Sequence, residues 1–388
     1  EYAPDPALWN SPALSCPLDS SAFVEYDISA HIPQLRSDSD NVLAIHTLNC
    51  NYTTSTDMLI LPELAATLQT EYDTDVPMFF AGPTPGVKNS GGTPYIVAPH
   101  FSRSCCLFTE NFNLELTADS PSAVIYYTLN GSDPTSSSPV YSGPIAITAG
   151  TLVKAAVYEP GIGWSKVAAQ GYSKLDPTTQ AFNSDIPIVV IDTFGNEIDV
   201  NERNVYTLAN AVFIDVDPIA GWADITNIPY YAGLGGIRVR GQSSALMPKK
   251  GYKFETWNKV SEEKNVSLLG MPAESDWAFF GPIFDKTLMR AILAFQWSNE
   301  IGRYAPRTRY CEMFLNTNGG NVVLGDLGDV NPDSPYDYPG DYVGFYVLME
   351  KIKSGPYCVD IAKLEPEDVA EPEMTGGYIL QSDWNNTF

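Results

Sequence analysis

Histidine, positive charge and long apolar runs are scarce in this chain of 388 residues. It holds three histidines, and its six cysteines form no Cys-x-x-Cys pair. A structural zinc site is therefore not expected, because such sites draw closely spaced ligands from these two residue types. With so few histidines and no Gly-x-Ser-x-Gly motif, the chain also lacks the base and the nucleophile turn of a serine hydrolase. No run of about 18 apolar residues is present, so we expect no membrane span.

The charged residues are strongly unbalanced toward acid. Lys and Arg number 22 against 47 Asp and Glu, which gives a net charge of −25 at neutral pH. Such a surface repels nucleic acids and anionic membranes, and it favours solubility, cation binding or basic protein partners. Hydrophobic residues make up 44% of the chain, which is enough for packed cores, so extended disorder is not expected.

The cysteine count and the glycosylation sequons indicate an extracellular or cell-surface protein. An even number of cysteines suits disulfides, which persist in oxidising compartments. The chain starts at Glu1 without Met and without an apolar secretory segment, so we expect a processed or trimmed fragment. Sequons of the form Asn-x-Ser/Thr mark surface loops of secreted proteins. They begin at Asn51, Asn130, Asn265 and Asn385.

Strand-like patterns dominate the N-terminal segment, residues 1–94. The length and the patterns together predict a mainly β, multidomain protein with about two or three domains. Runs such as Phe23–Ile28 and Asn41–Leu48 are short and apolar or alternating, as in the strands of a sandwich. A Gly- and Pro-rich stretch, residues 82–94, follows them as a linker.

Residues 95–175 contain a second group of strand patterns. Ala123–Leu129 and Thr151–Tyr158 are typical of strands, and Asn130-Gly131 directly after the first predicts a type I′ hairpin turn. The segment resembles the small immunoglobulin-like domain at the C-terminus of chitobiase and hexosaminidase enzymes. That domain is non-catalytic in those enzymes, so the resemblance implies either a spacer or a glycan-binding module.

The most informative stretch is Arg238–Glu255, where cations gather in an otherwise acidic chain. Alternation predicts two strands joined by a Gly-Gln-Ser-Ser loop, with Tyr252 and Phe254 sharing a face of the second strand. Backbone N–H groups of such a loop and nearby ammonium groups can converge on one anion. The alternative is a solvated edge hairpin whose lysines block aggregation.

Further blocks follow this stretch, in this order: Leu268–Trp277, Asp285–Arg290, Gly302–Arg309, Tyr346–Ile352, Val359–Leu364 and Gly376–Leu380. In this order and spacing they resemble the CotH family of spore-coat and secreted atypical protein kinases. The resemblance covers residues 185–383, and it implies that residues 176–388 form an α+β domain like the N-terminal lobe of a kinase. Residues 1–94 then look like the last strands of a jelly-roll module that precedes such domains in large secreted bacterial proteins.

The resemblance implies a site for ATP and Mg²⁺ in a full-length parent protein. Its phosphate-binding cation falls on Lys250 or Lys253, and strand alternation puts these two on opposite faces, so one of them would enter a cleft. The full set of cofactor-binding candidates is Arg240, Ser243, Ser244, Lys250, Lys253, Glu300 and Glu350.

A helix is predicted between Asp285 and Ile301. Asp285 is a natural N-cap, apolar residues follow at helical spacing, and Gly302 sits where a C′ residue belongs. Glu300 lies near the helix end, where a kinase-like lobe would carry the acidic partner of the nucleotide lysine.

The resemblance also implies what this sequence leaves out. The metal-binding and catalytic aspartates of the family would lie well beyond the Gly376–Leu380 block, and the sequence ends at Phe388. We therefore expect no catalytic residue in this chain and no phosphate transfer by it. Other nucleotide motifs do not replace them, because Asp192-Thr-Phe-Gly195 is not Asp-Phe-Gly and Gly233–Gly236 is a lone glycine cluster.

An acidic loop between Gly325 and Asp341 is a candidate calcium site. Its every-other-residue oxygen ligands follow the spacing of a calcium loop, but Ser334 stands where glycine is expected and Gly340 where glutamate is expected. A solvated acidic loop is the alternative. The candidate ligands are Asp329, Asn331, Asp333 and Asp337.

Cys311 and Cys358 occupy positions at which the CotH family usually has an apolar and a basic residue. Two such cysteines in one domain predict a mutual disulfide, worth ~3–4 kcal/mol in the chain-entropy description. The remaining cysteines would pair among the N-terminal modules, and they are Cys16, Cys50, Cys105 and Cys106.

Two classes of function remain open from the sequence. The first is a secreted atypical protein kinase that phosphorylates extracellular or coat proteins, of which this chain is a non-catalytic part. The second is a structural extracellular subunit of a surface layer or filament, in which copies meet head to tail. A glycan-binding module is a further alternative.

Overall fold

The computed structural model describes residues 78–79, 93–104, 106–202, 204–241, 244–325, 339–362 and parts of 364–379. The chain divides into two compact units, Glu1–Pro94 and Tyr95–Phe388. In the first unit, β1 (Met78–Phe79) pairs antiparallel with β2 (Thr93–Pro94). The strands predicted between residues 23 and 64, and the jelly-roll resemblance, lie outside the described residues.

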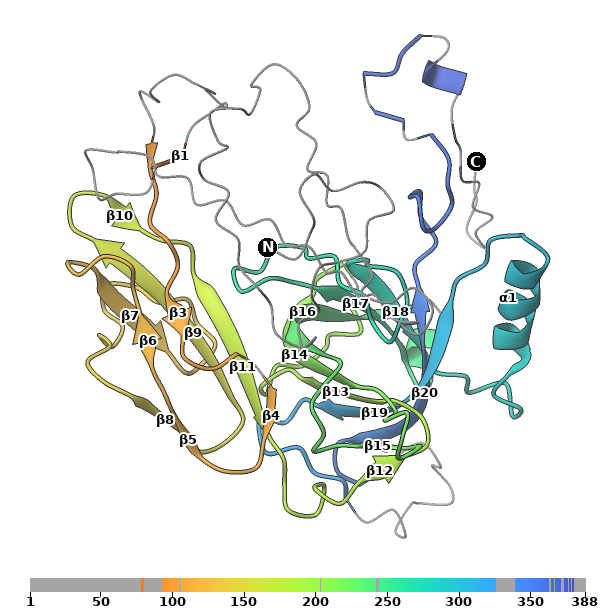
Figure 1. Ribbon diagram of the computed structural model, residues 1–388, viewed down its shortest axis with the longest axis horizontal. Coiled ribbons are helices and arrows are strands. Elements are labelled where there is room, and N and C mark those ends of the chain that lie inside the picture. Colours follow the sequence, from red (N-terminus) through yellow and green to blue (C-terminus); the bar gives the residue numbers. More distant parts are fainter. Residues whose placement is uncertain are drawn as a thin grey trace, which may run out of the picture. The chain divides into compact units, whose positions relative to one another are not determined.

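The first half of the second unit is a β-sandwich (Figure 1). Its strands are β3 (His100–Phe101), β4 (Cys106–Phe108), β5 (Phe112–Leu114), β6 (Leu116–Thr117), β7 (Val124–Thr128), β8 (Ile145–Ile147), β9 (Thr151–Glu159), β10 (Gly163–Trp164) and β11 (Ala168–Lys174). One sheet has the order β10-β9-β11-β4, with β7 also paired to β9. The pairs β3–β6 and β5–β8 close the core, where Leu114 and Ile147 contact Val153 and Tyr172 in one buried cluster.

The hairpin turn predicted at Asn130-Gly131 is wrong. Strand β7 pairs with β9 rather than with the next strand, and the chain returns to it only through a bridge between Tyr126 and Val140. Asn130 instead accepts hydrogen bonds from the N–H and hydroxyl of Ser132. Gly131 does take a positive φ of 79°, but as part of a longer loop. The pair Asn130-Gly131 therefore predicted a turn correctly, but the pairing of β7 with β9 makes the connection a longer loop than a two-residue hairpin turn.

The second half of the unit is a closed barrel of seven strands in the order β13-β14-β16-β17-β18-β20-β19. Its strands are β13 (Ile188–Asp192), β14 (Thr207–Ile214), β16 (Tyr231–Arg240), β17 (Gly251–Thr256), β18 (Asp276–Phe280), β19 (Thr308–Asn316) and β20 (Tyr342–Glu350). The parallel pairing of β13 with β19 closes the ring. Outside the barrel, β12 (Asn183–Ser184) pairs with β15 (Ala223–Asp224) in a small sheet. Two short 3₁₀ turns are η2 (Ser244–Leu246) and η4 (Glu373–Thr375).

Alternating side chains fill the barrel interior. Val189 and Ile191 of β13, Phe254 of β17 and Phe279 of β18 belong to one buried cluster with Trp277. Each large side chain buried in this way contributes about 1.5–3 kcal/mol of hydrophobic stabilisation. The mainly β, multidomain fold class predicted from the sequence is confirmed, and the segment predicted to form an α+β kinase-like lobe contains a closed barrel.

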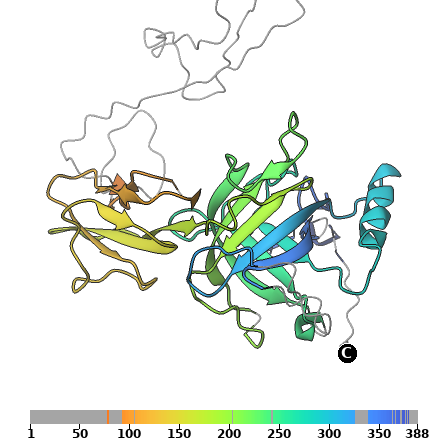
Figure 2. The same ribbon diagram turned by 90° about the horizontal axis from the view of Figure 1, so that it is seen from below.

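The single long helix of the described residues, α1 (Arg290–Glu300), lies outside the barrel, on the side away from the sandwich (Figures 1 and 2). It begins five residues later than predicted. The carboxylate of Asp285 accepts hydrogen bonds from the backbone N–H of Thr287 and of Arg290, so it orders the preceding turn, in which Leu288 takes a positive φ. Gly302 has the predicted left-handed conformation, with φ 77°.

Sandwich and barrel contact each other along a surface that we call the seam, where β11 packs against β14 and β16. Leu175, just after β11, is buried in one cluster with Val190 and Phe314. A second contact joins Leu152 and Ala169 of the sandwich to Leu234 of the barrel, where all three are buried. The domain boundary predicted at residue 175 stays a prediction, because residues 95–388 form one compact unit.

Within the described residues, no helix is long and apolar enough to cross a membrane.

The glycine cluster Gly233–Gly236 generates the first prediction. A Cβ on Gly235 would overlap the carbonyl oxygen of Glu255 and the ring of Phe254. Gly235→Ala should therefore lower the free energy of unfolding by about 1–3 kcal/mol, the range for overpacked cores. Gly143→Ala is the matched control, since nothing lies within 4 Å of a Cβ there. Urea unfolding of both variants measures the difference, and equal stabilities would contradict the close packing of β16.

Candidate functional site

One row of outward-facing side chains crosses four strands of the barrel. The register aligns Arg238 of β16 with Lys253 of β17. It then aligns Lys253 with Ala278 of β18, and Ala278 with Met349 of β20. Because alternate residues of each strand fill the core, this row is presented on the opposite face. Two cations therefore stand beside a small and an apolar side chain.

A hollow of about 350 Å³ lies over this row. The neighbouring row pairs Arg240 with Gly251, and the arginine stem packs closely over the glycine, since a Cβ there would lie 3.3 Å from Cγ of Arg240. Gly241 follows with a φ of 91°, which lets the chain leave β16 sharply. The hollow is lined by Arg238, Arg240, Gly241, Lys253, Trp277, Ala278, Met349, Glu350, Lys351 and Ile352.

A second hollow of about 310 Å³ continues from the first toward α1. Both are lined by Arg240, Gly241 and Met349, so we treat them together as one groove. The second part adds polar groups from the loop between β16 and β17, Ser244 and Lys249. It also adds apolar side chains, namely Phe279, Phe280, Ile283, Phe284, Ala291 and Phe295.

Asp276 forms ion pairs with two of the four cations that line the first hollow, Lys253 and Lys351, and with the nearby Lys353. Its carboxylate lies 3.0 Å from the Lys253 ammonium, 3.4 Å from that of Lys351 and 3.1 Å from that of Lys353. Burial raises the pKa of Asp276, but the hydrogen bonds and charges of these lysines outweigh it and hold the pKa at about 2. Asp276 is therefore ionised at neutral pH, and Lys253 is held in place by it.

Glu350 is also engaged. Its carboxylate lies 3.1 Å from Nε of Arg307 and accepts a hydrogen bond of 2.8 Å from the backbone N–H of the same residue. Burial raises the pKa of Glu350, while Arg307 lowers it. The side chain is 2% exposed, so it serves to anchor the end of β20 rather than to offer a free carboxylate to a ligand.

Arg240 and Lys249 are the groove cations that form no ion pair among the described residues. Lys249 donates a hydrogen bond of 2.7 Å to the carbonyl of Val343, and its ammonium lies 4.3 Å from the centre of the Tyr346 ring. Burial lowers the pKa of Lys249 to about 8, against the opposing charge of Glu312. Burial also lowers the pKa of Arg240. The sequence analysis missed Lys249, although the Lys-Lys pair was a signal for it.

The cofactor-binding candidates from the sequence lie at different places in the structure. Lys253 and Ser244 line the groove, whereas Lys250 lines a different hollow together with Glu197 and Asp199. Ser243 lies outside the described residues. The structure therefore brings Arg240, Ser244, Lys253 and Glu350 to one groove.

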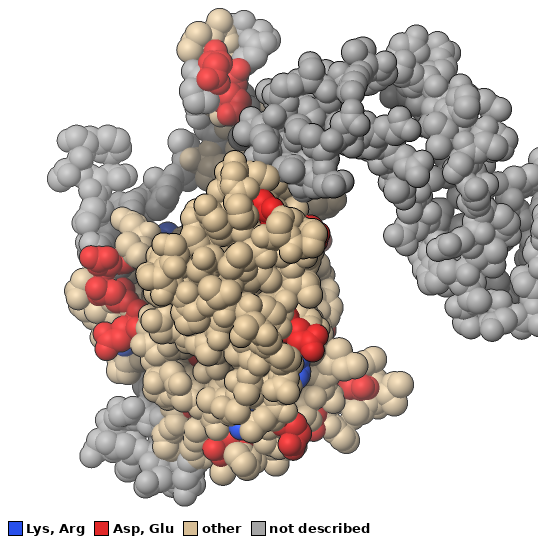
Figure 3. Space-filling model, turned by 90° about the vertical axis from the view of Figure 1, so that its left-hand side faces the viewer, with Lys and Arg blue, Asp and Glu red and all other residues tan. Residues whose placement is uncertain are grey.

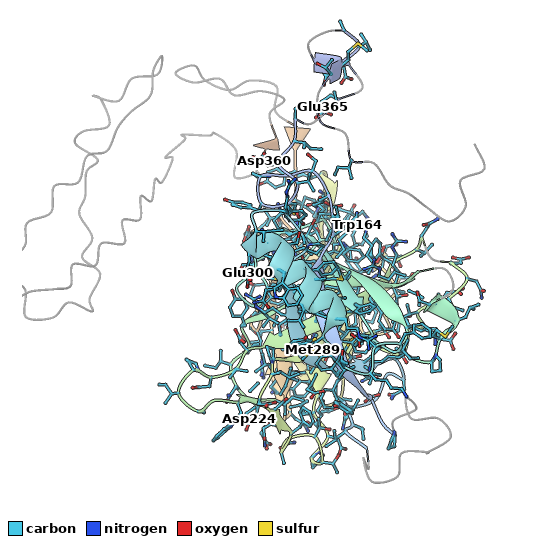
Figure 4. The ribbon with its side chains drawn as sticks, turned by 90° about the vertical axis from the view of Figure 1, so that its right-hand side faces the viewer. Trp164, Asp224, Met289, Glu300, Asp360 and Glu365 are labelled. Atoms are coloured by element: carbon cyan, nitrogen blue, oxygen red, sulfur yellow. The ribbon has the colours of Figure 1, made fainter. Side chains whose placement is uncertain are left out.

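Glu300 does not pair with the groove lysines. It accepts a hydrogen bond of 2.8 Å from the side chain of Gln296 on the same helix, and Figure 4 shows it and Met289 on the helix that faces the viewer. An ion pair between Glu300 and Lys253 is not found, because the carboxylate beside Lys253 is that of Asp276. The role of Glu300 as the acidic partner of a nucleotide lysine stays a prediction.

The predicted disulfide between Cys311 and Cys358 is contradicted, because both are free thiols. Cys311 lies on an inward-facing position of β19 inside the barrel, fully buried, with its sulfur 3.7 Å from the carbonyl oxygen of Tyr346. Cys358 follows β20 and is partly exposed. Burial raises the pKa of its thiol, while the hydroxyl of Tyr304 lowers it. Burial raises the pKa of the Cys311 thiol. The other four cysteines offer no test, since no side chain among them is described.

The predicted calcium ligands Asp329, Asn331, Asp333 and Asp337 lie outside the described residues. Within the described part of the chain, no group of three or more His, Cys, Asp or Glu side chains could hold a metal ion. Of the sequons, Asn130 and Asn265 are exposed. The sequons at Asn51 and Asn385 lie outside the described residues.

Two protein families match parts of this chain. Residues 114–172, within the sandwich, match the family described as Fn3 associated. Residues 237–369, which include the groove, match the family described as CotH kinase protein. No curated protein matches the chain.

The lysine cluster around Asp276 generates the second prediction. Asp276→Ala removes the carboxylate that pairs with Lys253 and Lys351, while Lys353 keeps its second partner, Glu274. The substitution should therefore lower the free energy of unfolding by about 2–3 kcal/mol at neutral pH. Asp360→Ala, which removes an exposed carboxylate, is the control. A depressed carboxyl pKa stabilises the fold above the unfolded value of about 3.9. This stability should therefore be lost in the wild type as the pH falls toward about 2. Equal stability of both variants in urea unfolding would contradict the role of the cluster.

Proposed function

This chain carries a CotH-family domain, preceded by an Fn3-associated domain, and on that premise we propose that the groove binds a nucleoside triphosphate for an atypical protein kinase. The observation that carries the proposal is the presence of two cations, unpaired within the described part of the chain, at the groove of a strongly acidic protein. In a chain with a net charge of −25, Arg240 and Lys249 face one hollow without an ion-pair partner among the described residues. Acidic side chains are prominent on the face of the molecule seen in Figure 3.

The groove offers different chemistry at its two ends. Toward α1, the guanidinium of Arg240 and the ammonium of Lys249 suit phosphate oxygens, which bind charged donors strongly. Over the strands, Ala278 and Met349 form a small apolar floor that suits an aromatic base. Gly241 connects the two parts, and its lack of a side chain permits close approach of a ligand.

A magnesium ion does not fit the described residues of the groove. Magnesium is bound by carboxylate and phosphate oxygens, and the described carboxylates beside the groove, Asp276 and Glu350, are held in ion pairs with lysines and with Arg307. The role that we propose for this part of the chain is therefore nucleotide binding, without phosphate transfer by these residues. We further propose an extracellular location, which the exposed sequon at Asn265 supports.

The third prediction tests nucleotide binding. Arg240→Ala and Lys249→Met should each weaken the binding of ATP by about 10-fold or more, because each removes a charged hydrogen bond worth roughly 1.5–3 kcal/mol. Lys250→Ala is the matched control, since it deletes the same charge from the same run but lines another hollow. Isothermal titration calorimetry measures the affinities. Absence of ATP binding by the wild type, or equal losses in all three variants, would refute the proposal.

A glycan-binding role for the sandwich is a second candidate, supported by three aromatic rings. The ring of Trp164 lies 5.1 Å from that of Tyr126 and 5.2 Å from that of Tyr158, centre to centre. The register places Trp164 of β10 directly opposite Tyr158 of β9, and Trp164 is 42% exposed. Exposed rings with an apolar face and a polar edge suit the faces of sugar rings.

The fourth prediction tests this candidate. The wild-type chain should be retained on chitin or cellulose, and Trp164→Ala should lower retention because it removes the central ring of the three. Tyr141→Ala removes an aromatic ring from another part of the sandwich and serves as the control. Retention that is unchanged by Trp164→Ala would refute this candidate and leave the spacer role. The self-assembly expected from the sequence stays a prediction.

A further inference from the structure

A row of polar side chains crosses the outer face of the barrel at the seam. Asp192 of β13 aligns with Asn210 of β14 on one side and with Asn316 of β19 on the other. These positions continue faces that are otherwise apolar, with Val190 and Val212 two residues away. Each of the three polar side chains is at most 1% exposed. Polar groups buried to this degree require hydrogen-bond partners.

Two oxygens in this row have no hydrogen-bond partner among the described residues. Asp192 accepts a hydrogen bond of 2.8 Å from the backbone N–H of Phe194 through one carboxyl oxygen, and its other oxygen, Oδ2, is buried without a donor. Asn210 donates to the hydroxyl of Ser173 at 3.2 Å, and its own oxygen, Oδ1, is likewise buried without a donor. Residues paired directly across antiparallel strands have Cβ atoms roughly 4.5–5.5 Å apart, and from the pairing of Asp192 with Asn210 we infer that the two oxygens can share one donor.

The seam leaves little space around these oxygens. A Cβ on Gly171 would lie 2.7 Å from Cβ of Asn210, and one on Gly150 would lie 2.9 Å from the carbonyl oxygen of Gly320 and 3.6 Å from Oδ2 of Asp192. A cation with its usual six or more oxygen ligands does not fit such a place. A single proton between the two oxygens satisfies both without added volume.

We propose that Asp192 is a neutral carboxylic acid that donates a hydrogen bond from Oδ2 to Oδ1 of Asn210, so that the contact between sandwich and barrel is linked to pH. In this arrangement one carboxyl oxygen accepts from Phe194 and the other donates to Asn210. All four polar atoms of the pair are then bonded. The sandwich contributes Ser173, whose hydroxyl oxygen accepts the hydrogen bond from the side-chain amide of Asn210 across the seam.

The surrounding charges favour the neutral acid. The acidic neighbour is Asp341, whose carboxylate accepts hydrogen bonds from the backbone of Val323 and the side chain of Asn318. Burial raises the pKa of Asp341, and these hydrogen bonds only partly offset the rise. The nearest lysine of β11, Lys174, instead bonds Asn111 and the carbonyl of Thr148. Burial, assisted by the charge of Asp341, raises the pKa of Asp192 to about 7, against the lowering effect of the Phe194 hydrogen bond and of the nearby Ser173 hydroxyl.

The direction of the pH effect follows from this shift. The unfolded chain releases the proton of Asp192 near pH 3.9, roughly the ordinary value for Asp, whereas the folded chain keeps it up to about pH 7. Between these values the folded state binds one proton more, so its stability falls as the pH rises. The contribution of Asp192 is largest in acid and is lost at mildly alkaline pH, where a charge is forced into the seam.

The experiment compares thermal unfolding of the wild type and Asp192→Asn at about pH 5 and about pH 8. The amide of the variant can donate to Asn210 as the neutral acid does, but it does not ionise. We expect the difference in Tm, variant minus wild type, to increase by several degrees between the lower and the higher pH. Asp185→Asn, which removes one exposed carboxylate, corrects for the net charge and should show no such gain.

A gain that does not depend on pH, or one that Asp185→Asn shows as well, would overturn the proposal. So would a calcium-dependent rise in Tm that is present in the wild type and lost in Asp192→Asn, because a cation would then satisfy both oxygens. The infrared band of a protonated carboxyl should be present in the folded wild type at about pH 6 and absent from Asp192→Asn. If that variant does not fold, Asn210→Ser changes the acceptor of the same proton and must shift the band. A band that stays unchanged would refute the proposal.

Discussion

Closure of the barrel is the constraint on which the groove and the seam both depend. Strand β13 pairs in parallel with β19, which lies more than a hundred residues later in the chain, and the other strands fill the ring between them. In a closed ring, alternate residues of every strand fill the core and the rest face outward. The register then decides which outward side chains meet. It brings Arg238 next to Lys253 on one part of the ring, and Asp192 next to Asn210 on another.

Ion pairs decide which of the many polar side chains remain available to a ligand. Three lysines surround Asp276, and Arg307 is joined to Glu350, so these groups hold strands and strand ends together. A strong attraction for an anion is then left to Arg240 and Lys249, which have no carboxylate partner among the described residues. Lys249 is held by a carbonyl and by the Tyr346 ring. In a protein of net charge −25, two such cations create a local field opposite to that of the whole molecule.

The seam shows how a covering domain changes the chemistry of a strand. On an exposed sheet face, Asp192 and Asn210 would be hydrated and unremarkable polar residues. Covered by β11 and by close-packed glycines such as Gly171, they lose water, and the carboxyl group is stabilised in its neutral form. The same packing that joins the two halves of the unit therefore makes their contact sensitive to protons.

The sequence by itself determined the strands and their faces, because alternation is a local property. Tyr252 and Phe254 share the barrel interior as their spacing predicts, and Gly302 ends α1 in the left-handed conformation. Only the tertiary structure decided what these elements meet. It placed Cys311 inside the ring away from a partner thiol, gave Lys253 the carboxylate of Asp276 rather than that of Glu300, and brought Lys249 to the groove. These outcomes depend on register and ring closure, which join residues far apart in the chain and leave no trace in local spacing.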